Sequence, residues 1–436
     1  MNASPAPAPL LRGLALTAAV ALGPIALLAT GAARLDVVTG VMLTLVGGLG
    51  AVIVRFSRSM LRGAPGAGRY AGALLATLAA VSTLVTANHL AVLAAAWTAT
   101  SLALHQLLTF FDDRPEALLA AHKKFLTSRL ADAFLWAAIA LIASVTGTLD
   151  LDALDRWAAA HATLPPALHL AAALLVVAAA LKSAQLPFHG WLTQVMEAPT
   201  PVSALLHAGV VNLGGFLMIR LAPLMARAPV AQLLLVAIGT ATAVIAALVM
   251  RTRVSVKVAL AWSTCAQMGF MLVECGLGLW HLALLHLVAH SLYKAHAFLS
   301  AGGAVDAWRV RSLTAPSPRS LRTVVAATRR AVVVASLFAL THLAAARLHL
   351  VPSYATPSIA AWAVAAAGVL ALVAVRGWLV ARPSSPLAET LHAWLFAGLY
   401  LDERFTRWAF RVWPPRLPPA APGPLTLRDA FEESAR

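Results

Sequence analysis

Apolar runs of about 20 residues recur along almost the whole chain, and this pattern limits the possible folds more than any other feature. A helix of that length crosses the hydrocarbon core of a bilayer, which is roughly 30 Å thick. The composition agrees, because 60% of the 436 residues are hydrophobic and 11% are charged. Soluble domains carry roughly 25% charged residues. The sequence therefore predicts an all-α fold, a polytopic transmembrane helix bundle.

The positions of these runs predict about twelve membrane-spanning helices. The expected spans are residues 10–31, 36–54, 70–88, 89–110, 124–146, 167–186, 202–222, 230–250, 256–276, 279–301, 331–350 and 358–380. We interpret the first run as a span and not as a cleaved signal peptide, because it lacks a clear small-residue cleavage site and many spans follow it.

Basic residues gather in loops that fall on one face of the membrane under this count. They are Arg55, Arg58, Arg62, Arg69, His122, Lys123, Lys124, Arg251, Arg253, Arg309, Arg311, Arg319, Arg322, Arg329 and Arg330. Since cytoplasmic loops are enriched in Lys and Arg, we expect this face and both termini to be cytoplasmic. The net charge of +16 then reflects membrane orientation, and no DNA- or RNA-binding motif supports a nucleic-acid partner.

A proline just beyond the sixth span predicts a discontinuous helix. Pro187 removes the hydrogen bond to the carbonyl four residues back. The chain nevertheless continues as the helix-compatible PFHGWLTQVM before an APTP stop at 198–201. Broken helices inside a membrane are tolerated where they line a cavity, and ion sites are often built there.

Lys182 closes the otherwise apolar run AAALLVVAAALK, about one helical turn before Pro187. A charged side chain at the centre of a membrane helix costs about 2.5–3.5 kcal/mol on insertion scales. A lysine near a helix end can instead extend its ammonium group to the membrane surface. Because the helix break follows directly, we favour a functional lysine on an ion path.

Three ionisable residues, His286, His290 and Lys294, follow one another at intervals of four in the tenth span. At 1.5 Å per residue they form one stripe about 12 Å long on a helix. Histidine exchanges protons near neutral pH, and burial favours the neutral, proton-accepting form of a lysine. The stripe therefore predicts a proton relay. A metal site is the alternative, although no acidic or thiol ligand lies nearby in the sequence.

Four further residues are weaker candidates. His207 in the seventh span is either a proton carrier or a buried histidine satisfied by a hydrogen bond. Lys257 begins the ninth span and either belongs to the path or marks the membrane surface. Asp132 could neutralise a buried lysine or pair with Arg129, and Glu197 at the helix break could neutralise a lysine or cap a helix.

The chain changes character after the last span. We expect the transmembrane bundle to occupy 1–383, an amphipathic cytoplasmic segment to occupy 384–413, and a Pro-rich irregular tail to occupy 414–436. The expected apolar stripe of the segment is Leu391, Leu395, Leu399 and Tyr400.

The sequence contains no motif for nucleotide binding, nucleophilic catalysis, haem or zinc. The two cysteines, Cys265 and Cys275, lie in one predicted span and form no metal or disulfide framework. We therefore expect no cofactor, no metal and no enzymatic activity of the chain's own.

Three segments closely resemble the antiporter-like membrane subunits of NADH–quinone oxidoreductase and of Mrp-type cation/proton antiporters. They are KSAQLPFHGWLTQVMEAPTPVSALLHAGVVNLGGF (182–216), KVALAWSTCAQMGFM (257–271) and HLVAHSLYKAHAFLSAG (286–302). A broader similarity covers about residues 80–305. The resemblance implies a proton-conducting bundle of two inverted repeats, with a shortened second half in this chain.

The resemblance also implies roles for the candidate residues. Lys182 matches the key proton-carrying lysine of the family, and Lys257 matches the connecting lysine of the second repeat. The other matches on the proton path are His207, His286, His290 and Lys294. The Trp–Glu pair of the family reads Trp97–Thr98 here, so the usual acidic partner of the lysine is absent. Asp132 matches a second acidic position that could replace it.

Two further segments, 104–134 and LYLDERFTRWAFRVWP at 399–414, resemble the membrane subunits of bacterial DAB-type inorganic carbon transporters. This resemblance implies a location in the bacterial inner membrane. It also implies a partner, DabA, a large zinc-containing protein similar to carbonic anhydrase. Proton or sodium flux through the chain would drive the conversion of carbon dioxide to bicarbonate in that partner. The alternatives are a subunit of a respiratory quinone oxidoreductase and a stand-alone sodium/proton antiporter.

Overall fold

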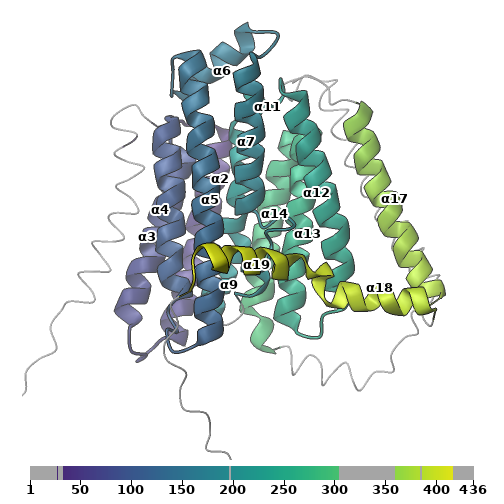
Figure 1. Cartoon of the computed structure of the whole chain (residues 1–436). Helices are drawn as coiled ribbons and strands as arrows, with labels where there is room; N and C mark the ends of the chain where they lie inside the picture. Colours follow the sequence, from purple (N-terminus) through teal and green to yellow (C-terminus); the bar gives the residue numbers. More distant parts are fainter. Residues whose placement is uncertain (1–26, 28–32, 196–197, 304–358, 383–384, 416–436) are drawn as a thin grey trace, which may run out of the picture.

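The computed structural model describes residues 27, 33–195, 198–303, 359–382 and 385–415. In these residues the regular structure is helical, and most helices stand side by side in one bundle (Figure 1). Eight helical segments are long and apolar enough to cross a membrane. The predicted all-α, multi-pass transmembrane bundle is therefore confirmed.

Ten of the twelve predicted spans coincide with helices. Of the other two, 331–350 lies outside the described residues, and residue 27 is the one described residue of 10–31. The helices of these spans are α2 (Val37–Met60), α3 (Ala67–Thr86), α4 (Leu90–Leu108), α5 (Pro115–Thr146), α7 (Pro166–Lys182), α9 (Thr200–Ala208) joined through the turn η1 (Val210–Asn212) to α10 (Leu213–Arg220), α12 (Pro229–Met250), α13 (Val256–Gly276), α14 (Trp280–Leu299) and α17 (Ile359–Ala381). The shorter helices are α6 (Leu151–Ala160), α8 (Gly190–Thr193), α11 (Ala222–Met225), α18 (Pro386–Phe396) and α19 (Leu401–Val412).

The helix α5 begins well before the predicted start of the fifth span. Pro115 suits the first helical position, and Glu116 suits the positive N-terminus of a helix, so the sequence favours a start there. Lys123 and Lys124 therefore lie inside α5 and are only 1% and 2% exposed. Their assignment to a basic loop is wrong, because they are buried residues of the bundle.

The remaining basic loops that the structure describes share one end of the bundle. α2 ends at Met60 and α12 ends at Met250, both at the lower end in Figure 1. α6, which carries Asp152 and Asp155, covers the opposite end. We refer to these two ends as the basic end and the acidic end.

The sixth predicted span breaks as expected from the sequence. α7 ends at Lys182, and Ala184 takes a φ of 53°, a left-handed conformation that interrupts a helix. The short helix α8 follows Pro187, and α9 begins only at Thr200. The predicted discontinuous helix near Pro187 is confirmed, and Lys182 is the last residue before the break.

A cluster of ion pairs fastens the start of α2 to other helices near the acidic end. Arg220 of α10 donates to Asp36 at 2.7 Å, and Arg34 pairs with Asp155 of α6 at 2.8 Å. Burial of Asp36 opposes its ionisation, but the hydrogen bonds from Thr39 and the charge of Arg220 outweigh it and hold the pKa of Asp36 below its ordinary value. The carboxylate therefore stays charged at neutral pH.

α12 and α13 approach each other so closely that only small residues fit at their crossing. A Cβ on Gly239 would lie 2.5 Å from the carbonyl oxygen of Gly269, and a Cβ on Gly269 would lie 2.6 Å from that of Gly239. Small residues of this kind let membrane helices pack backbone against backbone. The contact fixes the position of α13 in the bundle.

We predict that Gly239→Leu separates α12 from α13 and destabilises the protein. Overpacking a close contact typically costs about 1–3 kcal/mol, so the thermal unfolding midpoint of the purified protein should fall below that of wild type. Gly48→Leu is the matched control, because a Cβ on Gly48 meets no atom within 4 Å. Equal midpoints for the two variants would contradict the close contact.

Candidate ion path

Lys182 is buried at the end of α7, where its partners are a hydroxyl and a main-chain carbonyl. The residue is 3% exposed. Its Nζ donates to Ser101 Oγ and, at 3.3 Å, to the carbonyl oxygen of Trp97 on α4. The ammonium also lies 4.4 Å from the centroid of the Trp97 ring, a favourable cation–π distance. Within the described ranges no carboxylate forms an ion pair with Lys182.

Lys124 of α5 reaches the same serine. Its Nζ donates to the carbonyl oxygen of Ser101 at 2.7 Å, and the charges of Lys124 and Lys182 act on each other. Asp132 pairs with Arg129 at 2.8 Å, one of the two partners expected for it, and acts on the two lysines electrostatically. We call Lys182, Lys124, Ser101 and Asp132 the Lys182 cluster.

Lys294 of α14 has a similar setting. It is 0% exposed, and its Nζ donates to Ser263 Oγ and, at 2.9 Å, to the carbonyl oxygen of Leu260, both on α13. His207 of α9 is also fully buried and interacts electrostatically with Lys294. The His207 ring stacks on Phe298, with the ring centroids 4.2 Å apart.

The predicted stripe continues along α14 from Lys294 towards the acidic end. His290 is buried, and neither ring nitrogen has a hydrogen-bond partner in the described part of the chain. The His286 ring follows, with its centroid 6.2 Å from that of His290. Its Nδ1 lies 2.9 Å from Glu274 Oε2, and its Nε2 lies 2.9 Å from Gln267 Oε1. We call Lys294, His207, His290, His286 and Glu274 the Lys294 cluster.

Two predicted site residues are not joined to these clusters. Lys257 is half-buried at the start of α13, and no described hydrogen bond or ion pair connects it to either cluster. Glu197 lies outside the described residues. The other candidates fall into the Lys182 cluster or the Lys294 cluster.

Three members of the clusters are absent from the sequence-based candidates. Ser101 carries no distinguishing signal, because serine is common in membrane helices. Lys124 is missed because the fifth span is predicted to begin at that residue. Glu274 is an acidic residue within the ninth predicted span, and the short antiparallel hairpin of α13 and α14 places it against His286. An acid inside a span is a signal that could have identified it.

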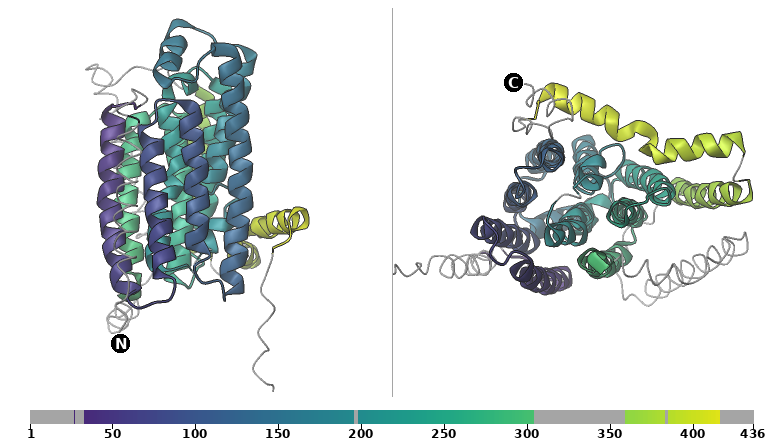
Figure 2. Two further views of the ribbon diagram at one scale, coloured as in Figure 1. Left: turned by 90° about the vertical axis from the view of Figure 1, so that its left-hand side faces the viewer. Right: turned by 90° about the horizontal axis from the view of Figure 1, so that it is seen from below.

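The C-terminal segment lies across the side of the bundle as two helices, α18 and α19 (Figure 2). The chain turns between them at Gly398, Leu399 and Tyr400, which all have a positive φ. Leu395 is buried as the apolar stripe predicts, but Tyr400 is 51% exposed. The turn interrupts the helix, so the expected stripe does not continue through Tyr400.

α19 is fastened to the helix break through Asp402. Its carboxylate accepts hydrogen bonds from Lys123 Nζ at 2.9 Å and from Gln194 Nε2 at 2.6 Å. It also lies over Gly190 of α8, where a Cβ would come within 1.4 Å of Asp402 Oδ1. Because Lys123 directly precedes Lys124, this contact joins the C-terminal segment to the part of α5 that belongs to the Lys182 cluster.

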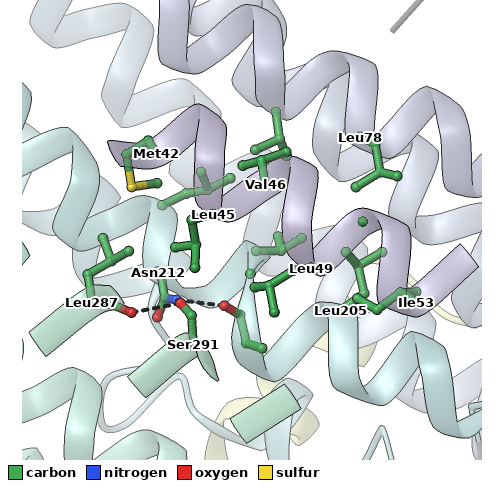
Figure 3. A pocket seen from close by; sticks show the side chains of 16 residues that line it. Met42, Leu45, Val46, Leu49, Ile53, Leu78, Leu205, Asn212, Leu287 and Ser291 are labelled. Carbon is green, nitrogen blue, oxygen red and sulfur yellow. Dashed lines mark hydrogen bonds between the residues drawn. The ribbon is translucent and has the colours of Figure 1, made fainter. Parts of the chain in front are cut away.

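A small cavity of about 40 Å³ lies between α2, α9 and α14 (Figure 3). Its lining is almost entirely apolar, and Asn212 donates to Ser291 Oγ at 2.8 Å within it. Among the residues that the structure describes, no titratable side chain lines the cavity. We therefore assign it to packing around the turn η1 and not to the candidate ion path.

Comparison with known proteins gives a family match that covers most of the described bundle. The model of the family described as NADH:quinone oxidoreductase/Mrp antiporter, TM, matches residues 87–380. The chain is 52% identical to the probable inorganic carbon transporter subunit DabB of Hydrogenovibrio crunogenus, over 63% of this chain and 53% of that protein. It is 48% identical to the probable inorganic carbon transporter subunit DabB2 of Halothiobacillus neapolitanus, over 69% of this chain and 54% of that protein. The chain thus spans about half the length of these relatives.

The fold is similar to a chain in the structure of an Mrp complex from a Dietzia species. The TM-score is 0.60 at 26% identity, and the alignment covers 92% of this chain and 52% of that chain. The predicted antiporter-like fold is confirmed by this similarity.

We predict that Gly190→Ala displaces Asp402 from Lys123 and Gln194, because the new methyl group needs the space that the carboxylate occupies. α19 should then be less firmly held, and limited proteolysis of the purified protein should cut beside it faster than in wild type. Gly72→Ala in α3 is the matched control, since its Cβ meets no atom within 4 Å. Cleavage at the same rate in both variants would refute the Asp402 contact.

Proposed function

Because the chain belongs to the NADH:quinone oxidoreductase/Mrp antiporter transmembrane family, we propose that it is the proton-conducting membrane subunit of an energy-coupled inorganic carbon transporter. Relatives at 52% and 48% identity are named as probable subunits of such transporters. Proton flow through this chain would drive the one-way conversion of carbon dioxide to bicarbonate in a partner protein.

One observation carries the proposal of proton conduction. Lys182 and Lys294 are buried in the bundle, and neither forms an ion pair with a described carboxylate. Each ammonium instead contacts a serine hydroxyl and a main-chain carbonyl. No contacting carboxylate stabilises the positive charge of a lysine in such surroundings, so the lysine can release a proton as well as accept one.

The proposed path leads from the Lys182 cluster to the Lys294 cluster. His207, His290 and His286 supply the further proton-exchanging groups of the second half. Lys257, at the basic end of α13, is proposed as an additional carrier. Asp132 and Glu197 are the proposed acidic charge partners. We favour protons over sodium ions because nitrogen groups that exchange protons outnumber the carboxylates along this path.

The chemistry is assigned to a partner because the sequence has no motif for a catalytic or zinc site. We propose that this partner is a large, DabA-like, zinc-containing subunit that resembles carbonic anhydrase. The proposed location is the bacterial inner membrane, with the basic end and both termini in the cytoplasm. The proposed units remain the bundle (1–383), the cytoplasmic segment (384–413) and the tail (414–436).

A subunit of a respiratory quinone oxidoreductase or of an Mrp-type antiporter is the second candidate. The similarity to a chain of an Mrp complex favours it. Purification of the complex from its native membrane separates the candidates. Iron–sulfur and flavin proteins would indicate the respiratory complex, whereas one large zinc protein would indicate the inorganic carbon transporter.

We predict that Lys182→Ala abolishes growth in air without added carbon dioxide in cells that depend on this chain for inorganic carbon. Removal of the amine deletes a proton carrier, while alanine suits the surrounding apolar helix, so the complex should still assemble. His161→Ala, which changes an exposed histidine at the acidic end, is the control and should grow normally. Normal growth of the Lys182→Ala strain would contradict the central role of Lys182.

The outer face of α19 is the proposed docking surface for the partner. Trp408 and Trp413 are 56% and 59% exposed, and exposed arginines flank them at 404, 407 and 411. Aromatic and arginine side chains are enriched at protein interfaces.

We predict that deletion of residues 387–413 prevents co-purification of the partner. Trp408→Ala should lower the amount of partner that co-purifies. The matched control is Trp362→Ala, because Trp362 is 47% exposed but lies on α17. Recovery of the full amount of partner with the truncated chain would rule out this docking surface.

A further inference from the structure

Residues of α4 form a stripe that leads from the Lys182 cluster towards the basic end. Trp97, Ser101 and His105 are spaced by four residues, so they share one face of the helix. The Trp97 carbonyl and the Ser101 hydroxyl accept hydrogen bonds from Lys182. His105 is the next member of the stripe, one turn closer to the end of α4 at Leu108.

His105 lines a cavity of about 340 Å³ at this end of α4 and α5. The other lining residues are Thr109, Leu118, His122, Trp413, Pro414 and Pro415. His122 Nε2 lies 2.7 Å from the carbonyl oxygen of Trp413, so the end of the C-terminal segment closes one side of the cavity. The volume is sufficient for several water molecules, each of which occupies about 30 Å³ in the liquid.

Lys124 connects this cavity to the Lys182 cluster. It acts electrostatically on His105, the charge of Lys182 acts on it, and it donates to the Ser101 carbonyl oxygen at 2.7 Å. Two ammonium groups at the same serine repel each other, so the pair favours a single positive charge, and a proton that arrives on Lys124 can move on to Lys182 when the Lys182 amine is neutral. The other charged or titratable groups that act on His105 are His122 and Arg129.

We propose that His105 is the entry residue through which protons pass from the basic end to Lys124 and then to Lys182. One ring nitrogen of His105 takes a proton from water in the cavity, and the ring gives up one proton to the neutral amine of Lys124. Lys124 then gives its proton to the Ser101 hydroxyl as this hydroxyl gives its own proton to the neutral amine of Lys182, so that Ser101 is unchanged at the end of the step. Each step has the net effect of moving one proton and changes no other bond. This assignment deepens the proposed function and rests on it, because it requires proton flow through the chain.

The first test compares histidines at the two ends of α4. His105→Gln keeps a hydrogen-bonding side chain that cannot take up a proton, and His89→Gln makes the same change at the acidic end of the helix. Both variants are expressed with the proposed partner in cells that depend on this transporter, and uptake of labelled inorganic carbon, supplied as carbon dioxide, is measured. His105→Gln should lower uptake more than about tenfold, as expected for loss of a positioned acid–base group. His89→Gln should retain uptake close to that of wild type.

The second test asks whether His105 lies on a water-filled entrance. The two native cysteines, Cys265 and Cys275, are both 0% exposed, so they give little background with thiol reagents. In sealed vesicles of the assembled complex, a membrane-impermeant maleimide should label His105→Cys from the basic face only. Labelling should stop the residual uptake, because the adduct fills the cavity. Thiol labelling from the acidic face, or labelling that leaves uptake unchanged, would overturn the entrance.

The two proposals fail in different ways. Full uptake by His105→Gln, together with loss of uptake by Lys182→Ala, overturns the entrance and leaves the proposed function standing. Full uptake by both variants overturns proton conduction through the Lys182 cluster itself. Should His105→Gln fail to assemble with the partner, the maleimide experiment on His105→Cys decides the question.

Discussion

The burial of lysine ammonium groups without a contacting carboxylate is the constraint on which the structure depends. A charge at membrane depth is costly, and a direct ion pair would lower that cost but also hold the proton in place. In this bundle Lys182 instead donates hydrogen bonds to one hydroxyl and one main-chain carbonyl, both on α4. Lys294 donates hydrogen bonds to the same two kinds of acceptor on α13. The repetition of this setting in two places is the physical basis for the proposed path of exchangeable protons.

The helix break at Pro187 explains how such a lysine is placed and how it can respond to a partner. α7 ends at Lys182, and the residues of the break present Gly190 and Gln194 to the side of the bundle. Asp402 of α19 occupies this position and also binds Lys123. A partner that binds the outer face of α19 would therefore act on α5 one residue away from Lys124. Such binding would provide a direct physical connection between the proposed chemistry of the partner and the buried charges of the bundle.

The sequence predicts most of the fold because hydrophobic length is a strong signal in a membrane protein. The predicted break at Pro187 and the stripe of His286, His290 and Lys294 are both present in the structure. The fifth span is predicted to start too late because Lys123 and Lys124 resemble a basic loop, and only tertiary contacts with Asp402 and Ser101 make their burial possible.

Other parts of the candidate site depend on contacts between distant segments and could not be predicted. The pairing of Asp402 with Lys123 joins residues 279 positions apart. The sequence allowed either a buried lysine or Arg129 as the partner of Asp132. In the structure Asp132 forms an ion pair with Arg129. Ser101 illustrates the same limit, because its role follows from the lysines of two other helices and not from its own surroundings in the sequence.

The most direct test of the central claim is a measurement of energy coupling in a purified system. Proteoliposomes that contain this chain and its proposed partner are given carbon dioxide and an imposed proton gradient, and bicarbonate inside them is measured over time. Proton conduction through the buried lysines predicts accumulation above equilibrium that stops when a protonophore removes the gradient. Accumulation that continues unchanged in the presence of the protonophore would contradict the account.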